Sequence, residues 1–278
     1  MTIGPSLDAI EHAYDVLLAL PDADSISFFS LQDHEQAARA GFERSCAYLF
    51  SDALNWLKFF WWSTAFKTRQ ITAALIREYN CDNYLAWMIL GRSTLEQAAV
   101  AFHFVKKIKQ LQLSGPHFAA SEVKAFEDLM LEYAHGTRFN WTDLLNGSLK
   151  ASGKKDFSSP SAPKAVNVLT ALSHLAKRDQ RYRDVEIAYA MLSDFAHPNM
   201  ASHATVVEMP SRQAGGGQVE IAADPGPLRG EFIAVVSTPW VSTGVGTNVE
   251  LLMELAPLLR AWADYIDSRA AVTFDFTK

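Results

Sequence analysis

Apolar residues recur at three- and four-residue intervals along most of the chain, a period that predicts amphipathic α-helices. The first helix is expected to begin at Ser6, whose hydroxyl suits a helix N-cap, and to end at Pro21. A second pattern, continuous or broken once, covers residues 33–79 and places apolar side chains on more than one face. Further helical patterns follow at residues 83–111, 119–135, 164–177, 182–196 and 248–271. The sequence therefore predicts a multi-helix bundle.

Residues 204–240 depart from this pattern. They hold β-branched runs at 205–207 and 232–236, separated by segments rich in Gly and Pro. Such runs between turn residues predict short strands. In the helix that follows, Pro257 is expected to cause a kink or to mark the real start of the helix. The fold class expected is all-α, a multi-helix bundle with a small β-hairpin insert near residues 204–240.

The size and composition of the chain suit one hydrophobic core. It has 278 residues, a length that a single core can still reach. Hydrophobic residues make up 49% of it and charged residues 20%, a balance typical of globular proteins. The insert is too short to fold independently. We therefore expect a single helical domain over residues 1–278 with a strand-rich insert at 204–240.

The charge, the cysteines and the N-terminal residues predict a cytoplasmic location. The formal net charge of −6 gives no general attraction to a phosphate backbone. Cys46 and Cys81 stand far apart in the sequence, as is usual for reduced thiols. The first residues lack the basic and apolar regions of a secretion signal.

The most apolar stretch of the chain, residues 46–66, is the candidate for a membrane-spanning helix. It is interrupted by Asp52, Asn55 and Lys58, so it never reaches the run of about 18 uncharged residues that a span needs. We expect a core helix there and no contact with a membrane.

Two short basic clusters fall near the ends of predicted helices. They consist of Lys106, Lys107 and Lys109, and of Lys177, Arg178, Arg181 and Arg183. Cations are stabilised near the C-terminus of a helix by its dipole. Solvated helix ends therefore account for both clusters, and a local phosphate-binding patch is the alternative.

A polar stripe crosses the otherwise apolar pattern at 83–111. Arg92, Glu96 and His103 fall within a narrow arc of a helical wheel. A charged stripe in such surroundings is either exposed along a groove or buried and paired. One interpretation is an ion pair between Arg92 and Glu96 within the helix. The other is a pocket wall on which Arg92 contacts an anionic ligand.

A second polar feature lies in the pattern at 182–196. Tyr189, Ser193 and His197 are each four residues apart and share one helix face. Pro198 places His197 at a helix end, where the dipole stabilises the charged imidazole. A histidine that only fixes helix packing is the alternative. The pair Ser193 and His197 does not indicate a hydrolase, because neither a third catalytic group nor a nucleophile elbow accompanies it.

A third feature is Glu132-x-x-His135, followed by Arg138. A carboxylate and a histidine three residues apart are the ligand pair of di-metal helical bundles. Asp194-x-x-His197 repeats the spacing with a shorter acid. A weak alternative is therefore a di-metal site formed by Glu96, Glu132, His135, Asp194 and His197. The main interpretation includes no metal and no cofactor.

The segment Arg92-Ser-Thr-Leu-Glu96 and the later segment from Tyr189 through Leu192-Ser193 to Ala196-His197-Pro198-Asn199 resemble a family of uncharacterised bacterial helical proteins. This family is grouped loosely with HEPN domains, which are named for nucleotide binding in higher eukaryotes and prokaryotes. The resemblance covers residues 48–203 and rests on short motifs. It implies a helical bundle, often dimeric, of which some members cut RNA.

The ribonucleases of that group carry an Arg followed by a His after four to six intervening residues. None of the 8 histidines of this chain follows an Arg at that distance. The resemblance therefore implies an altered or non-catalytic bundle, and we leave open whether the chain is an enzyme while favouring that it is not.

The leading functional hypothesis is a HEPN-like protein that binds a nucleotide, RNA or another anionic ligand in a polar pocket. The residues expected to form that pocket are Arg92, Glu96, His135, Arg138, Ser193 and His197. A structural protein without catalysis that forms a homodimer, through the aromatic run at 56–62 or the insert, is the first alternative. The di-metal bundle enzyme is the second.

Overall fold

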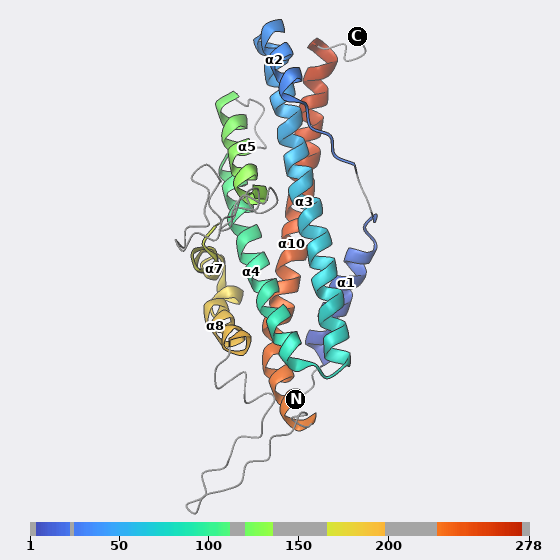
Figure 1. The fold of residues 1–278 in the computed structure, drawn as a ribbon, viewed down its shortest axis with the longest axis vertical. Helices are drawn as coiled ribbons and strands as arrows, with labels where there is room; N and C mark the ends of the chain where they lie inside the picture. The colour runs from blue at the N-terminus through green and yellow to red at the C-terminus, as the bar shows by residue number, and fades with distance from the viewer. Residues whose placement is uncertain (1–3, 23–24, 112–119, 136–165, 198–226, 274–278) are drawn as a thin grey trace, which may run out of the picture. The chain divides into compact units, whose positions relative to one another are not determined.

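A computed structural model describes residues 4–22, 25–111, 120–135, 166–197 and 227–273 of the chain. Every regular element in these ranges is a helix (Figure 1). The elements are α1 (Gly4–Leu18), α2 (Leu31–Ala40), α3 (Phe42–Asn80), α4 (Tyr84–Gln110), α5 (Ala120–His135), α7 (Val168–Ala176), η1 (Gln180–Tyr182), α8 (Val185–Ala196) and α10 (Pro227–Thr273). The expectation of an all-α bundle is confirmed. None of the described helices combines the length and the apolar character needed to cross a membrane.

The contacts of the chain divide it into two compact units. Unit 1 comprises Met1–Ala23, Ser63–His103 and Val168–Met253, and unit 2 comprises Asp24–Trp62, Phe104–Asn167 and Glu254–Lys278. Helices α3, α4 and α10 contribute a segment to each unit. The single domain expected over residues 1–278 stays a prediction.

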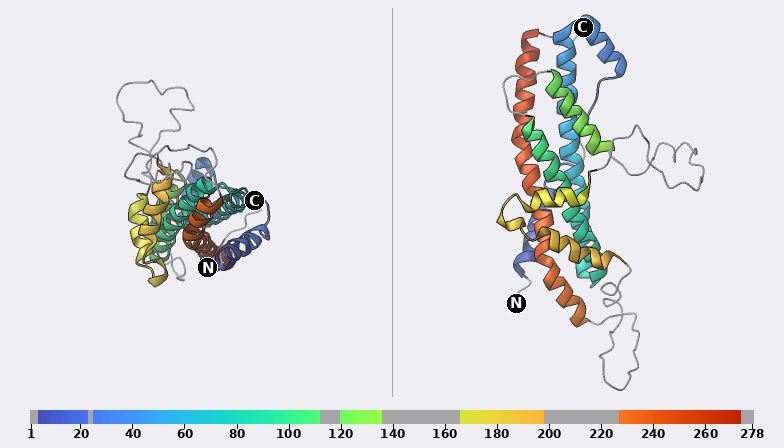
Figure 2. Two further views of the ribbon diagram at one scale, coloured as in Figure 1. Left: turned by 90° about the horizontal axis from the view of Figure 1, so that it is seen from below. Right: turned by 90° about the vertical axis from the view of Figure 1, so that its left-hand side faces the viewer.

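In unit 1, segments of α3, α4 and α10 are joined by α1, α7, η1 and α8. Helices α7 and α8 lie beside α4 and cross the long helices steeply instead of running along them (Figure 2). The core includes fully buried apolar side chains from each long helix, among them Leu75, Trp87, Met88, Leu95, Val241 and Val245. The unit is therefore a packed bundle and not a pair of isolated long helices.

A band of buried polar residues also runs through unit 1. Gln97 donates from Nε2 to the hydroxyl of Thr68 at 2.7 Å and to the carbonyl of Thr64 at 3.1 Å. Asn248 donates to the carbonyl of Thr94 at 3.2 Å. Buried polar groups need such partners, and each bond joins two different helices. These bonds fix how α3, α4 and α10 are aligned within the unit.

The pattern expected at 33–79 is broken at Gly41, between α2 and α3. Gly41 has φ 131° and ψ 166°, a backbone conformation open to glycine and strained for other residues. Helix α2 begins with a capping box, in which Ser30 and Asp33 each satisfy a backbone N–H of the other. The chain therefore turns sharply at one glycine between two well-formed helices.

The structure shows that the strand expected at 232–236 is wrong. These residues lie in α10, which begins at Pro227 and not near residue 248. The alternative that Pro257 marks the real start of the last helix is also wrong, since α10 continues through it. A short apolar run does not distinguish a strand from a buried helix segment. The run at 205–207 lies outside the described residues, so the hairpin insert is not seen.

The buried positions of α10 explain the error. They follow helical spacing through unit 1, at Ser237, Thr238, Val241, Val245, Thr247, Asn248, Leu251 and Leu252. Several are small and polar, so an apolar pattern alone does not reveal them. Tertiary packing therefore extends the helix over a segment with low helix propensity.

Candidate functional site

The polar stripe of α4 contacts α7 and α8 within unit 1. Arg92 donates from Nε to Glu96 at 3.0 Å and from Nη2 to the hydroxyl of Tyr189 at 3.1 Å. That hydroxyl donates to the same Glu96 oxygen at 2.9 Å, and the guanidinium lies 5.2 Å from the centre of the Tyr189 ring. The three side chains thus close a triangle of hydrogen bonds between α4 and α8. The ion pair expected between Arg92 and Glu96 is confirmed.

The triangle is half-buried, and its charges are matched. The side chains of Arg92 and Glu96 are 24% and 32% exposed. Burial lowers the pKa of Arg92, but the hydrogen bond to Tyr189 and the charge of Glu96 outweigh it, so that the pKa lies above its ordinary value. Nη1 of Arg92 makes no hydrogen bond within the described residues. The guanidinium is therefore fixed in orientation while part of its donor edge is unused.

Ser193 and His197 follow Tyr189 along α8 by one and two turns. The hydroxyl of Ser193 donates to the carbonyl of Tyr189 at 2.7 Å, so it is occupied by its own helix. His197 is the exposed C-cap residue of α8, as expected from Pro198. Four of the six residues predicted to bind a ligand, Arg92, Glu96, Ser193 and His197, thus belong to the α4 and α8 part of unit 1.

His103, the third member of the stripe, pairs with a histidine on α7 that the sequence did not single out. Nδ1 of His103 lies 3.0 Å from Nδ1 of His174, and the two rings are stacked and nearly parallel, with 6° between their planes. One imidazole must donate and the other accept, because the contact joins two ring nitrogens. The polar stripe of α4 therefore contacts both neighbouring helices: Arg92 and Glu96 contact α8, and His103 contacts α7.

The other predicted residues lie elsewhere in the chain. His135 is the last residue of α5, in unit 2, and Arg138 lies outside the described residues. Glu132 pairs with Lys107 at 3.8 Å. Asp194 is an exposed residue of α8. In the part of the chain that the structure describes, no three His, Cys, Asp or Glu side chains gather as metal ligands would.

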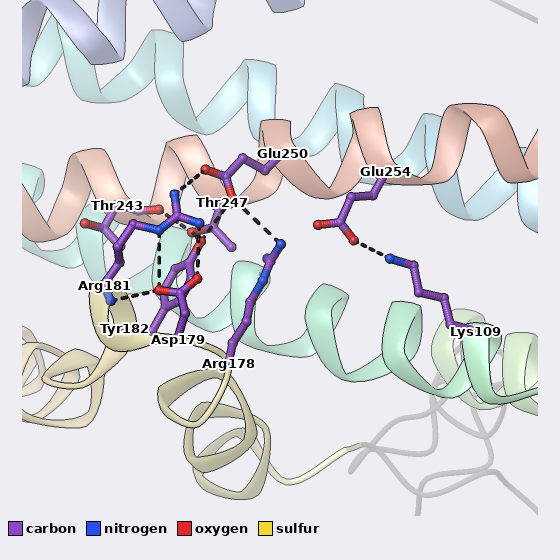
Figure 3. Close-up of polar contacts among 9 residues, drawn as sticks. All are labelled: Lys109, Arg178, Asp179, Arg181, Tyr182, Thr243, Thr247, Glu250 and Glu254. Atoms are coloured by element: carbon purple, nitrogen blue, oxygen red, sulfur yellow. Dashed lines mark hydrogen bonds and ion pairs between the residues drawn. The ribbon is translucent and has the colours of Figure 1, made fainter.

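The basic cluster at 177–183 is paired with acids of unit 1 (Figure 3). Glu250 of α10 accepts a hydrogen bond from Arg181 at 3.0 Å and lies 3.9 Å from Arg178. The hydroxyl of Tyr182 also donates to Glu250, at 3.1 Å, and burial raises the pKa of that phenol. The cluster therefore binds η1 to α10.

The cluster at 106–109 is also engaged by acids, in unit 2. Lys109 donates to Glu254 at 2.6 Å (Figure 3), and Lys107 pairs with Glu132. Neither lysine needs a phosphate to balance its charge. The ion pairs of Lys107, Lys109, Arg178 and Arg181 therefore give no support to a local phosphate-binding patch at these four residues.

Comparisons of the chain with protein-family models, with curated proteins and with solved structures found no match. Any function for this chain must therefore be argued from its own side chains.

Sequence reasoning missed one cluster, in unit 2. Asp52, only 5% exposed, lies with Oδ2 2.7 Å from Nε2 of His34 and accepts the backbone N–H of Phe29 on Oδ1 at 3.1 Å. Glu127 of α5 interacts electrostatically with both Asp52 and His34. Its pKa is raised, chiefly by burial, with a smaller contribution from the charge of Asp52. An acid inside the apolar run at 46–66 was the available signal.

Proposed function

We propose that the chain is a HEPN-like helical protein that binds an anionic ligand, a nucleotide or RNA phosphate, through Arg92. The observation that carries the proposal is the fixed guanidinium between α4 and α8. Its Nε and Nη2 are held by Glu96 and Tyr189, while Nη1 remains available to an acceptor from solvent. A planar guanidinium held in this way is suited to phosphate oxygens.

The surroundings of Arg92 support a site of modest affinity. Glu96 cancels the formal charge of Arg92, so an incoming anion meets a carboxylate as well as a cation. His197 ends α8 two turns beyond Tyr189 and is exposed, so an incoming ligand can reach its imidazole.

The test measures binding of a short fluorescein-labelled single-stranded RNA by fluorescence anisotropy, with AMP as a competitor. Arg92→Ala is expected to weaken binding about tenfold or more, since hydrogen bonds to charged groups contribute about 1.5–3 kcal/mol. Glu96→Gln is expected to strengthen binding, because it removes the competing carboxylate and keeps the side-chain shape.

Arg39→Ala provides the matched control. Arg39 also forms an i, i+4 ion pair, with Glu35, but on the exposed surface of α2 in unit 2. Its removal should leave RNA binding unchanged. If the wild-type protein binds neither RNA nor AMP, or if Arg92→Ala binds as tightly as the wild type, the proposal is wrong.

A structural role without catalysis is the second candidate, favoured by the closed triangle itself. In this candidate the hydrogen bonds among Arg92, Glu96 and Tyr189 serve to fix α8 on α4. Arg92→Ala would then speed hydrogen exchange in α8 without any effect on RNA binding. The homodimer predicted from the aromatic run at 56–62 belongs to this candidate. Phe59 in that run is 38% exposed, and Phe59→Ser should shift the molecular mass in light scattering if the run forms the interface.

A further inference from the structure

Residues 25–40, which we call the strap, comprise the segment before α2 and α2 itself, all in unit 2. We propose that the strap is a hinged element that opens about Gly41 and is held closed on α3 chiefly by one buried carboxylate, Asp52. This inference does not depend on the function proposed for Arg92.

The first argument is that two of the polar contacts between the strap and α3 meet on Asp52, beside another in which the Asn55 amide donates to the carbonyl of Ser27 at 2.6 Å. One carboxylate oxygen accepts the backbone N–H of Phe29, and the other is paired with His34. The Asp52 side chain is 7% exposed and that of His34 is 26% exposed, so the pair is largely shielded from water. A shielded, charge-assisted contact is stronger than an exposed one, and removing one partner leaves the other buried and unsatisfied.

The second argument is that little else binds α2 to the unit. Ala37 is its one buried residue among those that the structure describes, and Leu31 is 85% exposed. The segment before α2 adds ring contacts, in which Phe29 stacks on Tyr48 with centroids 4.0 Å apart. A helix with so small a buried face is held mainly by its specific contacts.

The third argument is that the strap can move as one rigid body. The capping box of Ser30 and Asp33 satisfies the N-terminus of α2 from within the strap. At the other end, the N–H of Gly41 donates to the carbonyl of Ala37. Both ends of α2 are thus capped without help from α3. The open state therefore keeps α2 folded while it exposes Asp52 and the ring of Tyr48.

The fourth argument concerns the hinge at Gly41 and the charge beside the contacts of Asp52 with Phe29 and His34, which we call the latch. A side chain at Gly41 would meet nothing within 4 Å, so the glycine is required by its backbone conformation and not by crowding. Glu127 places a second carboxyl close enough to act on Asp52.

The experiment is native-state hydrogen exchange on the full chain, read at two amides. The Phe29 amide reports the latch, because its acceptor is Asp52 itself. The Gly41 amide reports whether α2 stays folded, because its acceptor is Ala37. In the wild type, exchange at Phe29 should depend weakly on denaturant, as expected for a local opening, while amides in the middle of α3 exchange by global unfolding.

Two variants open the strap by different routes. Asp52→Asn removes the charge of the latch, and Gly41→Ala makes the closed hinge strained. Each should speed exchange at Phe29 by roughly tenfold to a hundredfold, while exchange of the amide at position 41 changes little. Arg39→Ala, on the same helix but exposed, is the control and should change neither amide.

The wild-type measurement keeps the proposal testable even if a variant fails to fold. If Phe29 in the wild type exchanges with the same denaturant dependence as α3, the strap does not open separately and the proposal is wrong. It is also wrong if Asp52→Asn leaves Phe29 as protected as in the Arg39→Ala control. Loss of protection at position 41 together with Phe29 would show unfolding of α2 and contradict a rigid strap.

Discussion

Gly244 and Gly246 lie two residues apart on α10 and are expected to respond to alanine in opposite ways. An ideal Cβ at Gly244 would overlap the Thr94 hydroxyl and lie 3.0 Å from Thr94 Cβ and 3.1 Å from the backbone nitrogen of Leu95. A Cβ at Gly246 would meet nothing within 4 Å. The two substitutions therefore add the same methyl group to the same helix, one against a packed neighbour and one into open space.

The magnitude follows from two opposing effects. Alanine in place of glycine favours a helix by about 1 kcal/mol. Overpacking a core costs about 1–3 kcal/mol. Thr94 has little freedom to retreat, because it is 1% exposed and its hydroxyl donates to the carbonyl of Gly91 at 2.7 Å. The overpacking cost at Gly244 is therefore in the upper part of that range, about 2–3 kcal/mol, and after the helix gain Gly244→Ala should destabilise the protein by about 1–2 kcal/mol. Gly246→Ala should stabilise it by about 1 kcal/mol.

Thermal unfolding followed by circular dichroism provides the assay. In a protein of this size about 1 kcal/mol corresponds to a Tm change of about 2–4 °C. Gly244→Ala should therefore lower the Tm by about 2–8 °C, and Gly246→Ala should raise it by about 2–4 °C. A Tm for Gly244→Ala equal to or above that of the wild type would show that α4 and α10 do not approach closely at Thr94, and the reasoning would fail.

Three further predictions concern buried or half-buried groups. Burial raises the pKa of Glu127, so the ionised carboxylate destabilises the folded state above that pKa. Glu127→Gln should therefore raise the Tm at about pH 7. The gain in Tm should shrink as the pH falls towards about 4, because the wild-type carboxyl then becomes neutral. A gain that is constant with pH would contradict this. Thr68→Val removes an acceptor of Gln97 and should lower the unfolding free energy by about 1–2 kcal/mol in urea titrations, whereas no change would mean that Gln97 finds another partner. Trp262→Phe removes the 3.0 Å hydrogen bond to the Phe50 carbonyl and reduces the ring volume at a position that is 1% exposed. It should lower the unfolding free energy by about 2–3 kcal/mol in the same urea titration. A loss under about 0.5 kcal/mol would refute the contact.

Part of the candidate site could be predicted from sequence because it is local. Arg92 and Glu96 are four residues apart on one helix, and their ion pair needs no tertiary information. The shared face of Tyr189, Ser193 and His197 follows from the same geometry. The partner of Arg92 across the bundle could not be predicted, since Tyr189 lies 97 residues away and no local rule selects it.

In the strap, too, one part of the arrangement could be predicted from local sequence and the other part only from tertiary structure. Asp52 was visible in the sequence as an acid inside an apolar run, which indicates a paired or exposed group. Its partners, His34 and the N–H of Phe29, became evident only when the chain was seen to turn back at Gly41. The sequence alone does not show whether a glycine in a helical pattern is a hinge or a tolerated helix residue.

The sequence by itself determined that the chain is helical, where most helices lie, and which residues of α4 and α8 share a face. These properties depend on the period of apolar residues and on neighbours three and four positions apart. Tertiary structure alone decided that the segment from Pro227 is helical and that Gly244 must be small. In that segment the close approach of α4 and the buried polar contacts outweigh a weak helix propensity, and both involve residues about 150 positions apart.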